Sequence, residues 1–190
     1  MAIGGAAAPL YAFTACTAAQ ISAGDANCPN NAALPCSIRS LVTLPAAATI
    51  CTFDFGNRAV TIGSVGGNGG KIRLDSKIIV LKAGSLTIQP NGSIEGMGPD
   101  TMPPNDVGGM VTIETTGGVT LLSGGGAQGK IDVSGRTKGG QVTIVAGGTV
   151  SVGATIDAGQ EANAANASGG SVGLSRASAS RRRCSRSTCP

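Results

Sequence analysis

Ionisable side chains recur at equivalent positions along the chain, each directly after an isoleucine. The isoleucines anchor short apolar segments, and the residues that follow them are Arg73, Glu95, Asp132 and Asp157. If these segments stack as neighbouring strands, the four side chains form one outward-facing column with neighbours about 4.8 Å apart. At that separation Asp132 and Asp157 could share a proton or a cation.

Three kinds of chemistry are consistent with this column. Each carboxylate could cap its own turn or be solvated on an outer face, which would make the column structural. Asp132 and Asp157 could instead bind calcium together with loop carbonyl groups, because calcium takes several oxygen ligands. Alternatively, two carboxylates about 5 Å apart suit a retaining glycoside hydrolase, with one as nucleophile and the other as acid/base. Glu95, Asp132 and Asp157 are therefore candidate catalytic residues, and no cofactor other than calcium is expected.

The composition excludes several other kinds of site. The chain contains no histidine, which excludes Ser-His-Asp and Cys-His catalysis. It contains no tryptophan, and its single tyrosine, Tyr11, precedes the repeated segments, so the usual platform for stacking sugars is missing. The glycine pairs open no apparent helix, so a phosphate-binding loop is not supported.

The net charge of +4 is concentrated near the end of the sequence. Five of the 14 basic residues lie in the last fifteen positions, and the other nine are balanced by 10 acidic residues. The body is therefore nearly neutral, and no specific nucleic-acid binding is expected. No stretch is long and apolar enough to predict a transmembrane segment.

Short strands must position the column. Between Gly139 and Gly159, three runs alternate apolar with polar or small residues, which is the period of a strand with one buried face. The same unit occurs upstream, and a partial copy follows; the first anchors are 32, 31 and 30 positions apart, at Ile79, Val111, Val142 and Val172. This spacing predicts an all-β parallel β-helix with three strands per coil and a period of about 30–32 residues.

Four cysteines precede the repeats: Cys16, Cys28, Cys36 and Cys51. Their even number and the Asn- and Pro-rich spacers between them favour two disulfides in an exported protein, with three pairings open. Free thiols and a zinc site are the alternatives, but there is neither a CxxC pair nor a histidine. The disulfides would staple an N-terminal cap over the open edge of the first coil.

The sequence predicts four regions. Residues 1–15 are a leader or the remnant of a signal peptide, and residues 16–56 are the cysteine-containing cap. Residues 57–175 hold the β-helix repeats, and residues 176–190 form a basic tail that is disordered or not native to the repeat. Loops at 96–108, 124–130 and 159–170 could form a binding face on one corner of the solenoid.

A short motif in the cap resembles that of a known class of proteins. Cys36-Ser37-Ile38-Arg39, preceded by Gly24-Asp25 and Cys28, is similar to the CSLREA-type segment that opens many exported bacterial β-helix proteins. Together with the GG-x-V-x-I repeats, it resembles haemagglutinin-like adhesins and autotransporter passengers. The resemblance implies export to the cell surface or the extracellular space, and adhesion or contact with glycans.

These observations together predict a structural or adhesive fragment of a secreted or surface-displayed bacterial β-helix protein that contacts polysaccharide. The alternative is a weak glycoside or ester hydrolase that uses the Glu95/Asp132/Asp157 column. Because the repeats stop within a coil, the chain is also expected to associate with itself through the open C-terminal coil.

Overall fold

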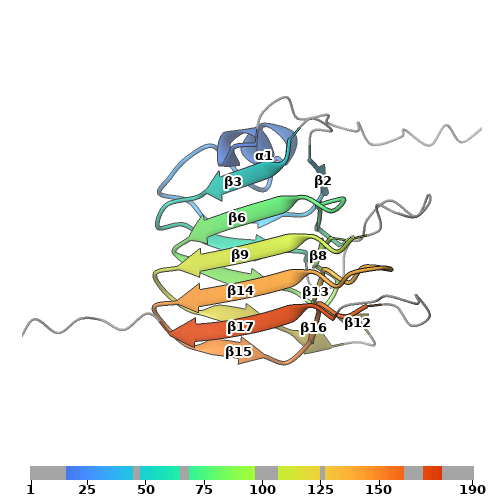
Figure 1. Ribbon diagram of the computed structural model, residues 1–190. Helices are drawn as coiled ribbons and strands as arrows, with labels where there is room; N and C mark the ends of the chain where they lie inside the picture. The colour runs from blue at the N-terminus through green and yellow to red at the C-terminus, as the bar shows by residue number, and fades with distance from the viewer. Residues whose placement is uncertain are drawn as a thin grey trace, which may run out of the picture.

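The computed structural model describes residues 16–44, 48–64, 69–96, 107–124, 127–160 and 169–176. These residues form a solenoid of parallel strands, with one short helix over its N-terminal end (Figure 1). Each coil contributes one strand to each of three sheets, which we name A, B and C. The predicted parallel β-helix with three strands per coil is confirmed. The predicted leader, residues 1–15, and residues 177–190 of the predicted tail lie outside the described residues.

In each coil the chain runs through sheet B, then sheet A, then sheet C. Sheet B contains β1 (Cys36–Ile38), β4 (Ala59–Ile62), β7 (Ser85–Ile88), β10 (Val119–Leu121) and β15 (Val150–Val152). Sheet A contains β2 (Leu41–Thr43), β5 (Lys71–Arg73), β8 (Ser93–Glu95), β13 (Lys130–Asp132) and β16 (Thr155–Asp157). Sheet C contains β3 (Ile50–Asp54), β6 (Ile78–Ala83), β9 (Met110–Thr115), β14 (Gln141–Ala146) and β17 (Ser171–Arg176). A small antiparallel pair, β11 (Ser123–Gly124) and β12 (Ala127–Gln128), lies between β10 and β13 in the chain.

The core consists of aliphatic columns that run along the solenoid axis. In sheet C, Val142 pairs with Val111 and Ile144 pairs with Ile113, and all four side chains are fully buried. From β6 to β17 the strands of sheet C begin 32, 31 and 30 positions apart, which is the predicted period. Because side chains alternate between the two faces of a strand, this register also fixes which residues face outward.

Glycines at the corners allow neighbouring coils to approach each other closely. A Cβ atom at Gly70 would overlap the carbonyl oxygen of Ile38, and one at Gly140 would overlap the carbonyl oxygen of Gly109. At these two positions the close approach of two backbones, rather than an unusual backbone angle, requires glycine. The glycines that precede the strands in the sequence therefore mark the corners of the coils.

Two disulfides staple the N-terminal cap, as the sequence predicts. Cys16 is bonded to Cys51 and Cys28 to Cys36, which resolves the pairing and excludes free thiols and zinc at these positions. Helix α1 (Ala18–Gly24) lies over β3 and buries Ile21 in the core (Figure 1). The helix thus closes the end of the core that the first coil would otherwise expose.

The predicted cap region also supplies the first coil itself. Strands β1, β2 and β3 lie within residues 16–56 and pair in parallel with β4, β5 and β6. Parallel pairing therefore begins at Cys36, earlier than the repeats predicted from residue 57, because β1 and β2 lack the glycines that mark later coils. At the other end, Arg176, predicted to belong to the tail, closes β17 and pairs with Ala146.

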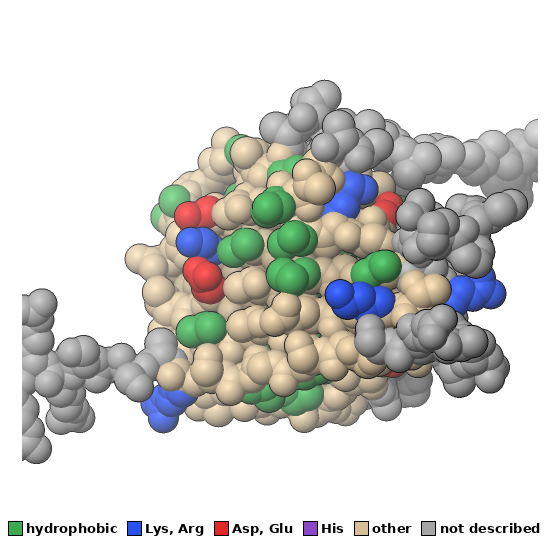
Figure 2. Space-filling view, in the orientation of Figure 1, with side chains coloured by type: hydrophobic (Ala, Val, Ile, Leu, Met, Phe, Trp, Pro, Cys, Tyr) green, Lys and Arg blue, Asp and Glu red, His purple; other side chains and the backbone are tan. Residues whose placement is uncertain are grey.

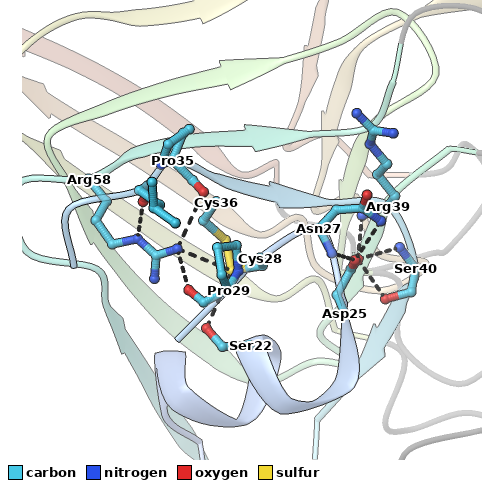
Figure 3. Close-up of a disulfide and its surroundings, with 11 residues drawn as sticks. Ser22, Asp25, Asn27, Cys28, Pro29, Pro35, Cys36, Arg39, Ser40 and Arg58 are labelled. Atoms are coloured by element: carbon cyan, nitrogen blue, oxygen red, sulfur yellow. Dashed lines mark hydrogen bonds between the residues drawn. A yellow bond between two sulfur atoms is a disulfide. The ribbon is translucent and has the colours of Figure 1, made fainter. Parts of the chain in front are cut away.

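A buried carboxylate fastens the cap to the first coil (Figure 3). Asp25 is only 4 % exposed, and its Oδ2 accepts hydrogen bonds from the backbone N–H groups of Arg39 and Ser40 at 2.6 and 3.0 Å. Its Oδ1 accepts the N–H of Asn27 at 3.0 Å. Burial alone would raise the pKa of Asp25, but these hydrogen bonds outweigh it and hold the pKa below its usual value.

A buried guanidinium fastens the other side of the cap. Arg58, which precedes β4, donates through Nε to the carbonyl oxygen of Leu34 at 2.8 Å and through Nη2 to that of Pro29 at 2.7 Å (Figure 3). Its guanidinium also lies 5.9 Å from the centre of the Phe55 ring. Since Arg58 belongs to the second coil, it ties the loop around the Cys28–Cys36 disulfide to the solenoid.

Candidate functional site

The predicted column of ionisable residues exists on the outer face of sheet A. Arg73 pairs with Glu95, Glu95 with Asp132, and Asp132 with Asp157, each on the neighbouring strand. The isoleucines before these residues are buried except at the last coil, so the acidic side chains point away from the core. The structure therefore brings all the predicted site residues together in the predicted order.

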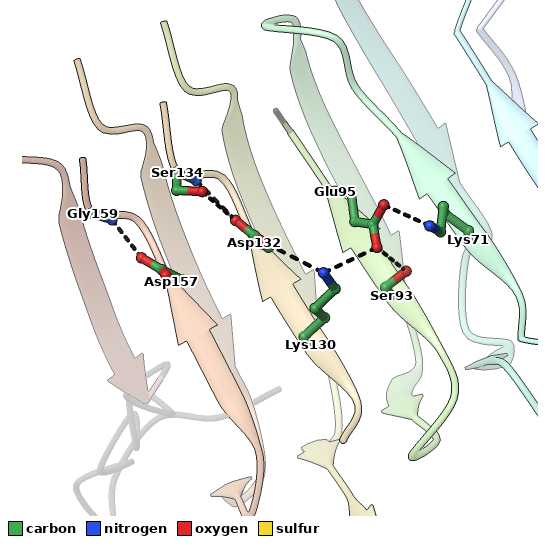
Figure 4. A network of polar contacts seen from close by, with 8 residues as sticks. All are labelled: Lys71, Ser93, Glu95, Lys130, Asp132, Ser134, Asp157 and Gly159. Carbon is green, nitrogen blue, oxygen red and sulfur yellow. Dashed lines mark hydrogen bonds and ion pairs between the residues drawn. The ribbon is translucent and has the colours of Figure 1, made fainter. Parts of the chain in front are cut away.

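Lysines lie between the carboxylates of this column (Figure 4). Lys130 Nζ is 3.2 Å from Glu95 Oε1 and 3.4 Å from Asp132 Oδ2. Lys71 Nζ lies 2.7 Å from Glu95 Oε2, and Ser93 donates its hydroxyl to Glu95 at 3.1 Å. We name Lys71, Glu95, Lys130 and Asp132 the sheet A charge ladder. Opposite charges alternate along it, so each carboxylate is neutralised by an ammonium group.

The surroundings keep both inner carboxylates ionised. Partial burial would raise the pKa of Glu95, but the hydrogen bond and charge of Lys71 and the proximity of Lys130 outweigh it, and the pKa is lowered. Burial also opposes ionisation of Asp132, yet hydrogen bonds from Ser134 and the charge of Lys130 lower its pKa. The same carboxylates raise the pKa of Lys130 against its own burial. Glu95, Lys130 and Asp132 thus stay charged at neutral pH.

Asp157, the last of the predicted site residues, is hydrogen-bonded to the turn that follows its own strand. Asp157 Oδ1 accepts the backbone N–H of Gly159 at 2.7 Å, and Asp132 Oδ1 accepts the hydroxyl of Ser134 at 2.6 Å (Figure 4). Each aspartate therefore binds the turn that follows its own strand. In the described part of the chain, no group of three or more His, Cys, Asp or Glu side chains is arranged to hold a metal ion. The calcium site at Asp132 and Asp157 stays a prediction.

Removing the central ammonium group should change the titration of its neighbour. We expect Lys130→Gln to raise the pKa of Glu95, because both the charge and a hydrogen bond that stabilise its ionised form are lost. NMR titration of the Glu95 side-chain carboxyl carbon measures this directly. Lys82→Gln is the matched control, since Lys82 pairs with Glu114 on sheet C at 3.3 Å. An unchanged Glu95 titration in Lys130→Gln would show that the ladder is not coupled.

The ladder lysines are the residues that the sequence analysis missed. Lys71 and Lys130 directly precede Ile72 and Ile131, as the acidic residues directly follow the isoleucines. Residues on either side of a buried strand residue share the outer face, so this pattern could have revealed the pairing. The omission matters because Lys130, between Glu95 and Asp132, and Lys71, beside Glu95, make two of the candidate catalytic carboxylates parts of a charge-balanced array.

An open groove of about 330 Å³ lies at the corner between sheets A and C. The residues that line it come from four successive coils: Ser76 and Ile78, then Val107–Met110, then Lys138–Gln141, then Gly169–Ser171. Ser76 Oγ donates to the carbonyl oxygen of Val107 at 2.6 Å, and the N–H of Gly108 donates to the carbonyl oxygen of Lys138 at 2.8 Å. These bonds join successive coils, so the groove has a continuous wall along the solenoid axis.

A second open pocket of about 360 Å³ lies where sheet C turns into sheet B. It is lined by the outer charged residues of sheet C, Asp54, Lys82 and Glu114, together with Thr115 and Val145. Lys82 and Glu114 already form an ion pair here, and both are about half exposed. This pocket is therefore an exposed, charged edge of sheet C rather than an enclosed binding site.

The residues that carry the resemblance to exported β-helix proteins lie together at the top of the solenoid. Asp25 binds the backbone of Arg39, and Cys28 is bonded to Cys36 beside it (Figure 3). This arrangement gives the motif a structural role in closing the first coil. The resemblance itself stays a prediction, since the chain matches no family model, no curated protein and no solved structure.

Proposed function

We propose that the protein is a structural and adhesive β-solenoid of an exported bacterial protein, and that its groove between sheets A and C contacts an extended polysaccharide. The observation that carries this proposal is the course of the groove across four successive coils. Coils of a solenoid are about 4.8 Å apart, so a groove that crosses four of them is elongated along the solenoid axis. A linear polymer is the ligand that matches its shape.

The chemistry of the groove also suits a polysaccharide. Ser76, Gln141 and Ser171 offer hydroxyl and amide groups, and Ile78 and Met110 offer apolar surface beside them. Sugars present hydroxyl groups at the edges of the ring and C–H groups on its faces, so both kinds of contact are useful. Lys138 adds an exposed ammonium group, which favours chains that carry carboxylates. Glycines leave the rest of the groove lined by backbone.

Export is supported by the cap. Disulfides persist in oxidising compartments, and the two in this cap close loops at the exposed end of the fold. In the described part of the chain, no helix has the length and apolar character needed to cross a bilayer. A secreted or surface-displayed protein is consistent with both features.

Adhesion is favoured over hydrolysis by the state of the sheet A charge ladder. A retaining glycosidase needs one carboxyl group that is protonated at the working pH. Glu95 and Asp132 both have lowered pKa values, and Lys130 lies between them. The ladder therefore supports stacking of the coils rather than acid/base catalysis by Glu95 and Asp132.

Binding to immobilised polysaccharides tests the proposal. Neutral and uronate-containing chains should be compared, and we expect retention of the protein on the uronate-containing ones at low salt. The double variant Lys138→Ala/Gln141→Ala should lose this retention, whereas Lys82→Ala, which removes a lysine outside the groove, should keep it. Retention that survives the groove variant, or no retention on any polysaccharide, would contradict the proposal.

A further inference from the structure

The upper end of the groove, nearest the N-terminal cap, is lined mainly by apolar side chains. Ser76 and Ile78 come from the coil of β6, and Val107 and Met110 come from the coil of β9. Ile78 pairs with Met110 on the neighbouring strand, and Figure 2 shows that apolar side chains lie over the upper strands of sheet C. Among these four side chains, only that of Ser76 carries a hydroxyl, amide or charged group. Polar recognition by side chains at this end therefore depends on Ser76.

The backbone N–H groups around this end are already hydrogen-bonded. Four of them donate to carbonyl oxygens elsewhere in the solenoid at 2.8–3.0 Å: those of Ile78, Gly108, Gly109 and Met110. Their hydrogens hold the coils together and are not available to a ligand. The hydrogen-bond donors that a groove lined by backbone could offer are thus used up at these four positions.

The hydroxyl hydrogen of Ser76 is also committed. Ser76 Oγ donates to the carbonyl oxygen of Val107 on the next coil at 2.6 Å. A hydroxyl has one hydrogen and two acceptor lone pairs, so Ser76 can offer a ligand only an acceptor while this bond is kept. The ligand group that fits beside Ser76 is therefore a donor, such as a free sugar hydroxyl.

Ser76 occupies a backbone conformation that favours glycine. Its φ is 63°, and Asp75 before it has a φ of 48°; these are the only non-glycine residues with positive φ in the described part of the chain. The N–H of Lys77 donates to the carbonyl oxygen of Leu74 at 3.1 Å, which closes a tight turn around the two residues. Glycine is preferred at the second position of a turn of this kind. The presence of a serine is therefore explained by its hydroxyl rather than by the turn.

The next coils of the groove have the opposite hydrogen-bonding character. Lys138 pairs with Val107 through a parallel bridge, so it lies one coil below the carbonyl group that orients Ser76. Its exposed ammonium group has three donors and no acceptor, and the amide of Gln141 can also donate. The groove thus passes from an acceptor at Ser76 to donors at Lys138 and Gln141.

We propose that Ser76 makes the groove selective for uronate-containing polysaccharides whose hydroxyl groups are free rather than acylated. This inference rests on the proposed function and adds a specificity-determining residue to it. A free hydroxyl of the sugar donates to Ser76 Oγ, while a carboxylate of the same chain accepts from Lys138. An O-acetyl group replaces the hydroxyl hydrogen and brings only acceptor oxygens. Ser76 would then face a group that it cannot bind, beside the apolar side chains of Ile78 and Met110, and unpaired polar groups in such surroundings weaken binding.

Binding of the full chain to one uronate-containing polysaccharide, in its O-acetylated form and after de-acetylation, tests the proposal. We expect the wild type to bind the de-acetylated form about 2- to 10-fold more tightly, which is the contribution of one hydrogen bond. Ser76→Gly removes the acceptor and supplies the residue that the turn favours. This variant should bind the de-acetylated form less tightly than the wild type does, and it should bind the two forms equally.

Thr116→Ala is the matched control. The hydroxyl of Thr116 also donates to a carbonyl oxygen of a neighbouring coil, that of Gly84 at 3.4 Å, but it lies outside the groove. This variant should keep the wild-type preference, and circular dichroism should show the wild-type strand signal for both variants.

Three outcomes would overturn the proposal. Equal binding of both forms by the wild type would show that Ser76 is structural only, and a preference that persists in Ser76→Gly would place the selectivity elsewhere. In both cases the proposed function would stand. Failure of the wild type to bind either form would overturn the proposed function together with this inference.

Discussion

Asp25→Asn is expected to lower the free energy of unfolding by roughly 3–5 kcal/mol. Both carboxylate oxygens of Asp25 accept hydrogen bonds in a buried site, Oδ1 from Asn27 and Oδ2 from Arg39 and Ser40. An asparagine has one acceptor oxygen, so either orientation of its amide turns an N–H group toward backbone N–H groups. The cap would lose the bonds that join it to the first coil. Chemical denaturation at neutral pH measures the loss.

Asp54→Asn is the matched control for this substitution. Asp54 Oδ1 also accepts a backbone N–H two residues on, that of Gly56 at 2.8 Å, but its side chain is exposed. Water can replace the lost acceptor there, so the cost should stay within about 0.5–1 kcal/mol. Equal losses of unfolding free energy in the two variants would show that the buried hydrogen bonds of Asp25 stabilise the fold no more than the exposed one of Asp54.

The contribution of Asp25 also depends on pH in a defined direction. Its pKa is lower in the folded protein than the ordinary value of 3.8, so it stabilises the folded state fully above that value. As the pH falls below 3.8 toward the folded pKa, the unfolded chain takes up the proton first and this stabilisation is lost. The stability difference between the wild type and Asp25→Asn should therefore shrink with acidification below 3.8. Denaturation curves measured on both sides of this pH provide the check.

Removing the disulfide between Cys16 and Cys51 is expected to cost about 4 kcal/mol. The bond joins residues 35 positions apart, so its loss in a Cys16→Ala/Cys51→Ala variant frees a long loop in the unfolded chain. The cap also loses its covalent link to β3, beneath the helix that covers the core. A loss of this size is a large share of the 5–15 kcal/mol typical of whole domains. Denaturant unfolding under non-reducing conditions gives the value.

The second disulfide supplies the comparison for the first. Cys28 and Cys36 are only 8 positions apart, so the Cys28→Ala/Cys36→Ala variant should lose less, roughly 2–3 kcal/mol on loop length alone. The order of the two losses, rather than their absolute size, is the sharper test. A larger loss from Cys28 and Cys36 would mean that contacts with Arg58 and Ser22 outweigh the closure of the chain.

The register of the coils could be predicted from the sequence because it depends on two features: the alternation of apolar and polar residues within each strand, and the repeat of about 30–32 residues between coils. The positions of Ile94 and Ile131 fix those of Glu95 and Asp132, since the side-chain period of a strand is two. Val111, Val142 and Val172 repeat at nearly constant intervals, which places the strands of sheet C over one another. No long-range information was needed for the column.

The cap could not be predicted in the same way. Asp25 is buried because a loop brings Arg39 and Ser40 back over it, and no periodic pattern encodes that path. Arg58 looks like a surface residue in the sequence, yet it is 7 % exposed and binds three carbonyl groups. Of the three loops predicted to form a binding face on one corner, 96–108 and 159–170 join sheets A and C, where the groove lies, whereas 124–130 joins sheets B and A. The groove itself could not be predicted, because its lining residues are adjacent only after the coils have stacked.

The corners of the solenoid differ in how much chain they can hold. Where sheet C turns into sheet B, one to four residues separate the strands in every coil. The connections from sheet B to sheet A have two to eight residues, and those from sheet A to sheet C range from four after β5 to 14 after β8. Lengthening a loop costs little free energy, and the strands on both sides keep their register. The three sheets thus form a constant frame, and the connections between sheets A and C are the margin that varies most. Because the groove lies along that margin, chains of this architecture could diverge in what they recognise while conserving how they fold.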